Sequence, residues 1–293
     1  MKRVIVIGGP TASGKTSLAI EVARHFGTEI ISADSRQFYR EMRIGTARPS
    51  PEELAAVSHH FVADRSVTEP LSAGRFAEEG LHRLREIFTS HDLAVVVGGS
   101  GLFIRALCEG LDEFPEVTQE ARRRVEEIEA REGLSGLQRA LREADPAYFG
   151  EVDQQNGRRL QRALRVCFTE GLPYSSYLNK VTPRSFQSHY YALAPERAYL
   201  YQRIEKRVDH MLANGLEEEA RSLLAYQQLP ALQTVGYQEW WPYFREEYPR
   251  DRAIELIKRN SRRYAKRQVT YFRDFRAVED FTEIAAQMEA VLG

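Results

Sequence analysis

The chain carries, close to its N-terminus, the run Gly9-Pro10-Thr11-Ala12-Ser13-Gly14-Lys15-Thr16. An apolar segment, residues 4–7, comes directly before it, and residues 17–23 after it have the apolar spacing of a helix. The pattern G-x-x-x-x-G-K-T between a strand and a helix is typical of a phosphate-binding P-loop. Its glycines let successive backbone N–H groups point at one anion, and the helix N-terminus adds the positive end of its dipole. The run therefore predicts a strand–loop–helix unit that binds a pyrophosphate or polyphosphate.

The last two residues of this loop supply its side-chain chemistry. Lys15 offers a mobile positive charge to phosphate oxygens, and Thr16 offers a hydroxyl that can ligate Mg²⁺. The alternative is a glycine-rich turn with no ligand, which the flanking strand and helix patterns disfavour. The motif does not say which phosphate compound is bound or what happens to it.

Length and composition place the chain among ordinary globular proteins. At 293 residues it can bury a large core, so we expect an α/β domain with an elaboration. The net charge is −1, so any nucleic-acid surface must come from local clusters of basic residues. Two cysteines, Cys108 and Cys167, are too few for a disulfide scaffold and favour the reducing cytoplasm. No apolar run is long enough to predict a signal peptide or a membrane span.

Alternation of strand and helix patterns predicts the fold of the core. Short apolar runs at 4–8, 29–33 and 93–98 predict buried parallel strands, and residues 15–26 and 75–88 predict helices between them. A further strand is predicted at 189–193. The fold class is therefore α/β, a P-loop NTPase-like doubly wound parallel sheet whose ligands bind at the C-terminal ends of the strands.

The character of the chain changes between residues 111 and 188. Three segments there, 118–131, 134–143 and 154–170, are polar, helical in pattern and rich in arginine. We therefore predict a helical insertion domain at 111–188 in a core formed by 1–110 and 189–293. Helices are predicted again at 196–226, 234–244 and 250–272.

Two strand ends carry further candidate site residues. Asp34 follows the second strand and so lies at the same sheet edge as the P-loop, where a carboxylate can ligate Mg²⁺, act as a general base or cap a helix. The third strand ends in Gly98-Gly99-Ser100-Gly101, without the acid that many NTPases carry there. Ser100 is either a hydroxyl donor to a ligand or the N-cap of a tight strand–helix turn.

Basic residues gather in two segments of this nearly neutral chain. Arg158, Arg159, Arg162 and Arg165 follow Asn156, and residues 258–276 contain eight Lys or Arg against one acid, with Tyr264, Tyr271 and Phe272 interleaved. Such clusters suit RNA phosphates and unstacked bases, and the alternative is a solvated helix face. Arg203 and Arg207 are spaced i,i+4, so they share one helix face, either in surface salt bridges or aimed at a pyrophosphate.

Together these motifs resemble the tRNA dimethylallyltransferase family. The shared runs, in order along nearly the whole chain, are residues 9–16, 31–39, 44–49, 59–60, 97–104, 156–164, 203–212, 236–239 and 266–270. The P-loop is generic, whereas Ala33-Asp34-Ser35, the Gly-Gly-hydroxyl run and Gly236-Tyr237 together are specific. Ser100 stands where family members usually carry Thr, and the chain has no C-terminal Cys₂His₂ finger of the kind found in eukaryotic relatives.

The resemblance implies a reaction and a set of site residues. The P-loop would hold the diphosphate of dimethylallyl diphosphate, and Asp34 would engage the N6 amine of the adenosine 3′-adjacent to the anticodon. Lys15, Asp34 and Ser100 would be catalytic, with Mg²⁺ at Thr16. The diphosphate would contact Gly9, Pro10, Thr11, Ala12, Ser13, Gly14, Lys15, Thr16, Arg203 and Arg207. The tRNA anticodon stem-loop would contact Asp34, Ser35, Arg36, Gln37, Ser100, Arg158, Arg159, Leu160, Gln161, Arg162, Arg263, Lys266 and Arg267.

We expect a cytoplasmic, monomeric enzyme that does not bind membranes. Three other functions are weighed against this one. A P-loop kinase for a nucleoside or small metabolite would turn over ATP and ignore tRNA. A prenyltransferase could act on free adenine nucleotides, and a non-catalytic RNA-binding NTPase switch would leave Asp34 and residues 98–101 unexplained.

Overall fold

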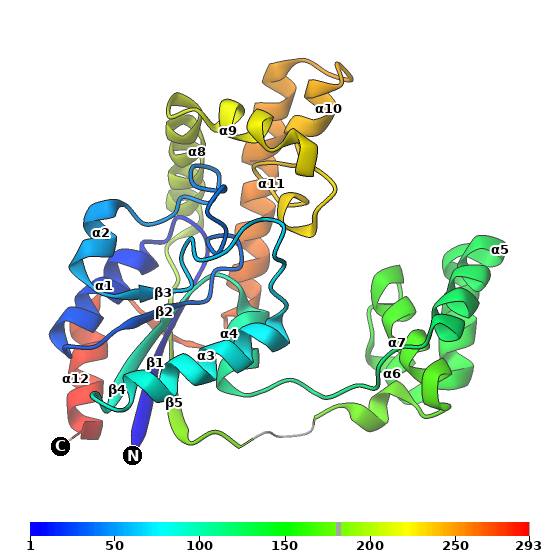
Figure 1. Ribbon diagram of the computed structural model, residues 1–293, viewed down its shortest axis with the longest axis horizontal. Helices are drawn as coiled ribbons and strands as arrows, with labels where there is room; N and C mark the ends of the chain where they lie inside the picture. The colour runs from blue at the N-terminus through cyan, green and yellow to red at the C-terminus, as the bar shows by residue number, and fades with distance from the viewer. Residues whose placement is uncertain (180–182, 293) are drawn as a thin grey trace. The chain divides into compact units, whose positions relative to one another are not determined.

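Short apolar runs form a parallel sheet in the computed structural model, which describes residues 1–179 and 183–292 (Figure 1). The six strands found there lie in the order β3 (His59–His60), β2 (Ile30–Ser32), β4 (Leu93–Val97), β1 (Lys2–Gly8), β5 (Phe186–Leu193) and β6 (Arg276–Val278). Val6 of β1 lies beside Val96 of β4 and Tyr190 of β5. The predicted parallel sheet is confirmed, and β3 and β6 extend it at its two edges.

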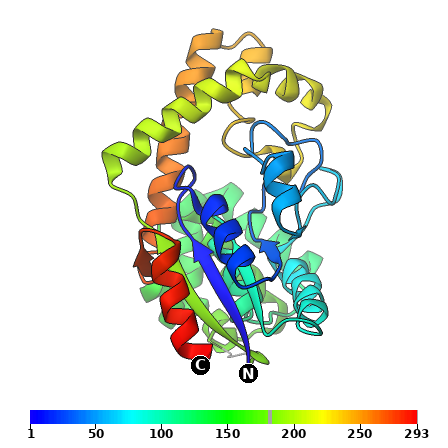
Figure 2. The same cartoon turned by 90° about the vertical axis from the view of Figure 1, so that its left-hand side faces the viewer.

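Helices cover both faces of this sheet because alternate residues of each strand point to opposite sides. On one face, α1 (Lys15–His25) and α12 (Phe281–Leu292) pack together over Ile5 and Ile7 (Figure 2). On the other face, α3 (Ala73–Ile87) and α4 (Gly101–Cys108) pack over Val4 and Val6. This two-sided covering is the doubly wound arrangement that the sequence predicts.

The remaining helices of this unit lie beyond the C-terminal ends of the strands (Figure 1). They are α2 (Pro51–Ala56), α8 (Arg197–Ala213), α9 (Leu216–Ser222), α10 (Trp240–Phe244) and α11 (Arg250–Tyr271), with 3₁₀ turns at Leu224–Tyr226 and Pro230–Leu232. The sequence predicted one helix over 196–226. Instead α8 ends at Ala213, because Gly215 takes a left-handed φ of 94° and starts α9 in a new direction.

The chain divides into two compact units, Met1–Cys108 with Arg184–Gly293, and Glu109–Pro183. The second unit contains α5 (Gln119–Ala144), α6 (Pro146–Glu151), α7 (Gly157–Glu170) and a 3₁₀ turn, Tyr174–Tyr177. Gly133, at φ 60°, kinks α5 at the point where the sequence predicted a break between two helices. Compared with the predicted insertion at 111–188, the unit ends earlier, since residues 186–188 belong to β5.

Each unit has its own core. That of the second unit is built from apolar side chains of α5 and α7 and from the segments after them: Val125, Leu137, Leu141, Phe149, Leu160, Leu164 and Tyr174. In the first unit, Arg184 donates hydrogen bonds to the carbonyl oxygens of Leu107 (2.9 Å) and Ala106 (2.8 Å). The chain therefore leaves the first unit and returns to it at neighbouring points. Among the described residues, no helix is long and apolar enough to cross a membrane.

Candidate active site at the phosphate-binding loop

The P-loop joins β1 to α1 in a conformation suited to holding an anion. Gly9, Ala12 and Gly14 have φ values of 145°, 64° and 101°, which fold the loop tightly over the start of α1. Gly14 is the N-cap of α1, and no side chain in the described part of the chain caps this helix. The first N–H groups of α1 are therefore available to a bound phosphate, as the predicted motif requires.

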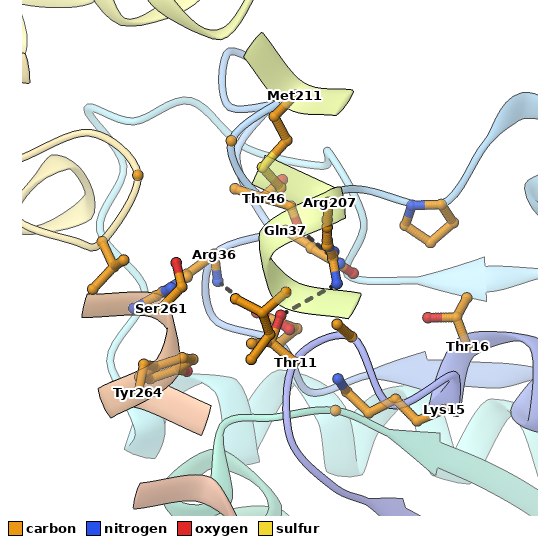
Figure 3. A pocket seen from close by; sticks show the side chains of 18 of the residues that line it. Thr11, Lys15, Thr16, Arg36, Gln37, Thr46, Arg207, Met211, Ser261 and Tyr264 are labelled. Atoms are coloured by element: carbon orange, nitrogen blue, oxygen red, sulfur yellow. Dashed lines mark hydrogen bonds between the residues drawn. The ribbon is translucent and has the colours of Figure 1, made fainter. Parts of the chain in front are cut away.

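Three cationic side chains point at this loop. Lys15 donates to the carbonyl oxygen of Pro10 (3.3 Å), and Arg207 of α8 donates to Oγ1 of Thr11 (3.2 Å) (Figure 3). The guanidinium of Arg203 lies 3.9 Å from the position that a Cβ on Gly14 would take. The shared face predicted for Arg203 and Arg207 is confirmed, because both side chains line the same cavity.

Burial lowers the pKa values of two of these cations. The pKa of Lys15 falls to about 8, because desolvation outweighs the attraction of Asp34, and the positive charge of Arg207 lowers it further. Burial also lowers the pKa of Arg207, again against the attraction of Asp34. Two partly buried cations thus lie near the carboxylate of Asp34, and an anionic ligand between them would compensate their charge.

The site residues surround a cavity of about 330 Å³. Its polar lining includes Thr11, Lys15, Thr16 and Arg207, which Figure 3 labels. The carboxylate of Asp34 lines it as well. Its apolar wall consists of side chains from α8, from the segment before α10 and from α11: Ile204, Val208, Met211, Val235 and Ile257. A ligand with an anionic end and a small apolar group would satisfy both parts.

Asp34 lies in a turn after β2 and does not cap a helix. One of its carboxylate oxygens accepts the backbone N–H of Arg36 (3.2 Å), and the next helix, α2, starts only at Pro51. The helix-cap interpretation of Asp34 is therefore wrong. Its carboxylate lines the cavity, where either a proton or a metal ion can be accepted.

Ser100 supports the Asp34 turn. Its Oγ accepts the backbone N–H of Ser35 (3.0 Å) and lies 2.9 Å from the hydroxyl of Ser35. Tyr264 of α11 lies near Ser100, and burial raises the pKa of the Tyr264 hydroxyl. Ser100 is not among the residues that line the cavity. Its contact with a leaving diphosphate stays a prediction, while its contact with Ser35 is direct.

Two residues of α11 contact the loops of the site: Gln268, which had no predicted role, and Tyr264, which was predicted only as one of the aromatic residues of the basic run. Gln268, which is 5% exposed, accepts the backbone N–H of Thr11 (2.8 Å) and donates to the carbonyl oxygen of Gly99 (2.8 Å). A Cβ on Gly99 would lie 2.2 Å from Nε2 of Gln268, so this contact requires glycine. The ring of Tyr264 stacks under the guanidinium of Arg36 at 4.0 Å. An uncharged amide within a basic run was the only sequence signal for Gln268.

Comparison with known proteins places the chain in a family. The family model described as IPP transferase matches residues 37–275. The chain belongs to the IPP transferase family. It is 50% identical to the tRNA dimethylallyltransferase of Christiangramia forsetii, covering 92% of this chain and 90% of that protein. It is 43% identical to the tRNA dimethylallyltransferase of Flavobacterium psychrophilum, covering 93% and 91%.

Solved structures of family members have the same fold. The crystal structure of the full-length tRNA isopentenylpyrophosphate transferase of Bacillus halodurans matches with a TM-score of 0.70 at 32% identity, covering 99% of this chain and 95% of that one. The structure of a eukaryotic dimethylallyltransferase acting on tRNA matches with a TM-score of 0.76 at 26% identity, covering 92% and 70%. The P-loop-like α/β fold of this family member is therefore shared along nearly its whole length.

The basic run of α11 divides into paired and exposed parts in this IPP transferase. Lys258 forms an ion pair with Asp209 of α8, and Arg262 forms one with Glu205. The side chains of three other cations, Arg263, Lys266 and Arg267, are exposed. Part of the predicted RNA surface is thus used to attach α11 to α8, and the exposed part keeps its predicted role.

The predicted tRNA contacts of the second unit lie on α7. Arg158, Arg159 and Arg162 are exposed there, and Gln161 donates to Oε1 of Glu129 (2.7 Å). Leu160 is fully buried in the core of the unit. A contact between its side chain and tRNA was therefore predicted wrongly, because the helical period turns this one position of the basic segment inward.

The residues of the cavity fit a magnesium ion that is coordinated mainly by a bound phosphate compound and water. The described residues contain no cluster of three or more His, Cys, Asp or Glu side chains able to hold a metal. Thr16 and Asp34 do line the cavity, and they offer one hydroxyl and one carboxylate. Mg²⁺ bound with phosphates commonly takes only one or two protein ligands, the rest being phosphate oxygens and waters.

Proposed function

We propose that this protein is a tRNA dimethylallyltransferase, which transfers the dimethylallyl group of dimethylallyl diphosphate to N6 of the adenosine 3′-adjacent to the anticodon and releases pyrophosphate. The observation that carries the proposal is one cavity that combines a P-loop with two partly buried cations, the carboxylate of Asp34 and an apolar wall. The family relatives named above support the same reaction.

The reaction follows from these residues. The diphosphate binds the N–H groups of the P-loop, Lys15 and Arg207, and the five-carbon group lies against the apolar wall. The N6 nitrogen attacks C1 of the dimethylallyl group, the C1–O bond to the diphosphate breaks, and Asp34 accepts the N6 proton. An exocyclic amine is a weak nucleophile because its lone pair is delocalised into the ring, so loss of this proton drives the step. Charge developing on the pyrophosphate is stabilised by the preorganised cations.

Magnesium and tRNA complete the proposal. Mg²⁺, held by the Thr16 hydroxyl and the diphosphate, would neutralise charge on the leaving group. The target base lies within a stacked anticodon loop, so it must be extruded to reach Asp34. The exposed arginines of α7 and the exposed cations of α11 would bind the RNA backbone. We also propose that the enzyme is a cytoplasmic monomer.

One experiment separates this function from its alternatives. The protein is incubated with isotope-labelled dimethylallyl diphosphate and either tRNA or AMP, and labelled ATP is supplied in a parallel reaction. Label transferred to tRNA supports the proposal. Transfer to AMP alone would establish a nucleotide prenyltransferase, and ATP turnover without prenyl transfer would establish a kinase or NTPase.

A further inference from the structure

A carboxylate of α9 holds a turn that the mechanism above does not use. Three consecutive backbone N–H groups, those of Arg43 (3.0 Å), Ile44 (2.8 Å) and Gly45 (2.9 Å), donate to the carboxylate of Glu219. A charged acceptor forms stronger hydrogen bonds than a neutral one. The turn is therefore fixed in one conformation by a side chain that lies more than 170 residues further along the chain.

Tyr237 reinforces this contact. Its hydroxyl donates to Oε1 of Glu219 (2.7 Å), and its side chain is fully buried. Burial and the neighbouring Glu219 raise the pKa of Tyr237 well above its usual value, so the hydroxyl remains a donor at every relevant pH. A Cβ on Gly45 would lie 2.5 Å from the Tyr237 ring, so only glycine allows the ring to reach Glu219.

The same turn continues to the phosphate-binding loop. Ala47, two residues after Gly45, has a left-handed φ of 45° and presents its carbonyl oxygen to two donors. These are Nε2 of Gln37 (3.2 Å) and Nη2 of Arg207 (3.4 Å). The other terminal nitrogen of Arg207 donates to Oγ1 of Thr11 in the P-loop. The Ala47 carbonyl therefore sets the angle at which the guanidinium faces the site.

We infer that Glu219 is a positioning residue for diphosphate binding, acting through residues 43–47 on Arg207. A planar guanidinium gives strong phosphate contacts only in a limited range of orientations. A side chain whose rotamer is fixed before the ligand arrives loses less conformational entropy on binding. The inference rests on the proposed function only in taking the ligand to be a diphosphate.

The test measures binding of inorganic pyrophosphate, in the presence of Mg²⁺, by titration calorimetry without tRNA. Four full-length proteins are compared: the wild type, Glu219→Gln, Arg207→Gln and the double variant. We expect Glu219→Gln to weaken binding on the order of fivefold to fiftyfold, as for groups coupled in one hydrogen-bond network. In the Arg207→Gln background, the same change should have no further effect.

Two outcomes would overturn the inference. One is pyrophosphate affinity in folded Glu219→Gln equal to that of the wild type. The other is an equal loss in both backgrounds, which would show that Glu219 acts on the fold and not through Arg207. Steady-state kinetics adds a second measurement: KM for dimethylallyl diphosphate should rise more than kcat falls, and KM for tRNA should stay unchanged.

Matched variants keep the test interpretable. Glu217 lies on the same helix and pairs with Arg221 (3.1 Å) and Arg250 (2.7 Å), away from the turn. Glu217→Gln should therefore lose comparable stability but keep pyrophosphate affinity. If Glu219→Gln does not fold, Tyr237→Phe removes one hydrogen bond from the same carboxylate and should weaken pyrophosphate binding in the same direction, while unchanged binding would contradict the inference. Because the readout needs no prenyl transfer, failure here is distinguishable from failure of the proposed function.

Discussion

Asp34 is the only carboxylate among the described residues that line the cavity, and this makes its role sharply testable. Asp34→Asn keeps an oxygen that can accept the Arg36 N–H but removes the base. We expect the single-turnover rate of prenyl transfer to fall by about 10²–10⁴-fold, the usual contribution of a general base. The affinity for tRNA should remain largely intact, as measured by filter binding. Retention of more than about half the rate would exclude Asp34 as the base.

The lowered pKa of Lys15 predicts that diphosphate binding depends on pH. Its pKa is lowered to about 8 chiefly by burial, so its charge is present below that pH and is lost as the pH rises through it. Affinity for pyrophosphate should therefore decrease on the alkaline side of pH 8. Since pyrophosphate itself titrates, Lys15→Gln is the control. It should bind weakly and lack the additional alkaline loss, and identical profiles for the two proteins would contradict the assignment.

Among single residues, the sequence predicts those that belong to a recognisable motif. The P-loop, Asp34 and the shared face of Arg203 and Arg207 follow from spacing and strand ends alone. Gln268 and Glu219 could not be predicted, because their contacts join loops and helices that are far apart in the chain. Ser100 was found by its position, but its closest partner, Ser35, is visible only in three dimensions.

The helix α11 connects the P-loop to the loop after β4 through the hydrogen bonds of Gln268. In Gln268→Leu, the N–H of Thr11 and the carbonyl oxygen of Gly99 lose their buried partner. We expect a loss of about 1–3 kcal/mol in the free energy of unfolding, the cost of unpaired buried polar groups. Prenyl transfer should also slow, because Thr11 loses its anchor. Denaturant titration of Gln268→Leu beside the more exposed Gln233→Leu measures the difference, and equal losses would contradict it.

The exposed face of α11 predicts how tRNA binding responds to salt. Neutralising Arg263, Lys266 and Arg267 should weaken tRNA binding, and each phosphate that is no longer neutralised should reduce the slope of log K against log salt by roughly 0.7–0.9. The control removes three cations of α3: Arg75, Arg83 and Arg85. An unchanged slope in the α11 variant, with an unchanged thermal melt, would show that these side chains form only a solvated face.

Helices and strands were predicted correctly where the sequence has a clear hydrophobic period. Long amphipathic runs such as α3, α7 and α11 are correct within a few residues. The strands β3 and β6 were not predicted, because they are only two and three residues long. The helices α2 and α12 were not predicted either. Such short edge strands carry no period of their own, and the neighbouring strand determines them.

The whole molecule consists of two separately packed units, so damage to one core should spare the other. Leu160 is fully buried in the second unit. Leu160→Ala should destabilise that unit by about 2–5 kcal/mol, the usual cost of such a cavity. We expect weaker tRNA binding with unchanged pyrophosphate affinity, measured by calorimetry. A parallel loss of pyrophosphate affinity would show that the two units do not behave independently.

For the whole molecule, the sequence predicts a sheet from alternating strand and helix patterns, and an inserted helical segment from a change of composition. It places the end of that segment five residues too late, at 188 and not at 183, because the polar start of β5 has no strand pattern. The second unit's contribution to tRNA binding stays a prediction, since its exposed arginines are typical both of an RNA surface and of a solvated helix.

The bonds from Arg184 to Leu107 and Ala106 have a consequence for how the chain folds. The strand β5 lies next to β1, yet it reaches that place only after residues 109–183 have been traversed. Closing a loop of flexible chain costs entropy that grows with its length. If the inserted segment collapses first, β5 has a shorter effective path to its neighbour. The second unit would then finish folding before the first unit, although the N-terminal part of the first unit is synthesised earlier.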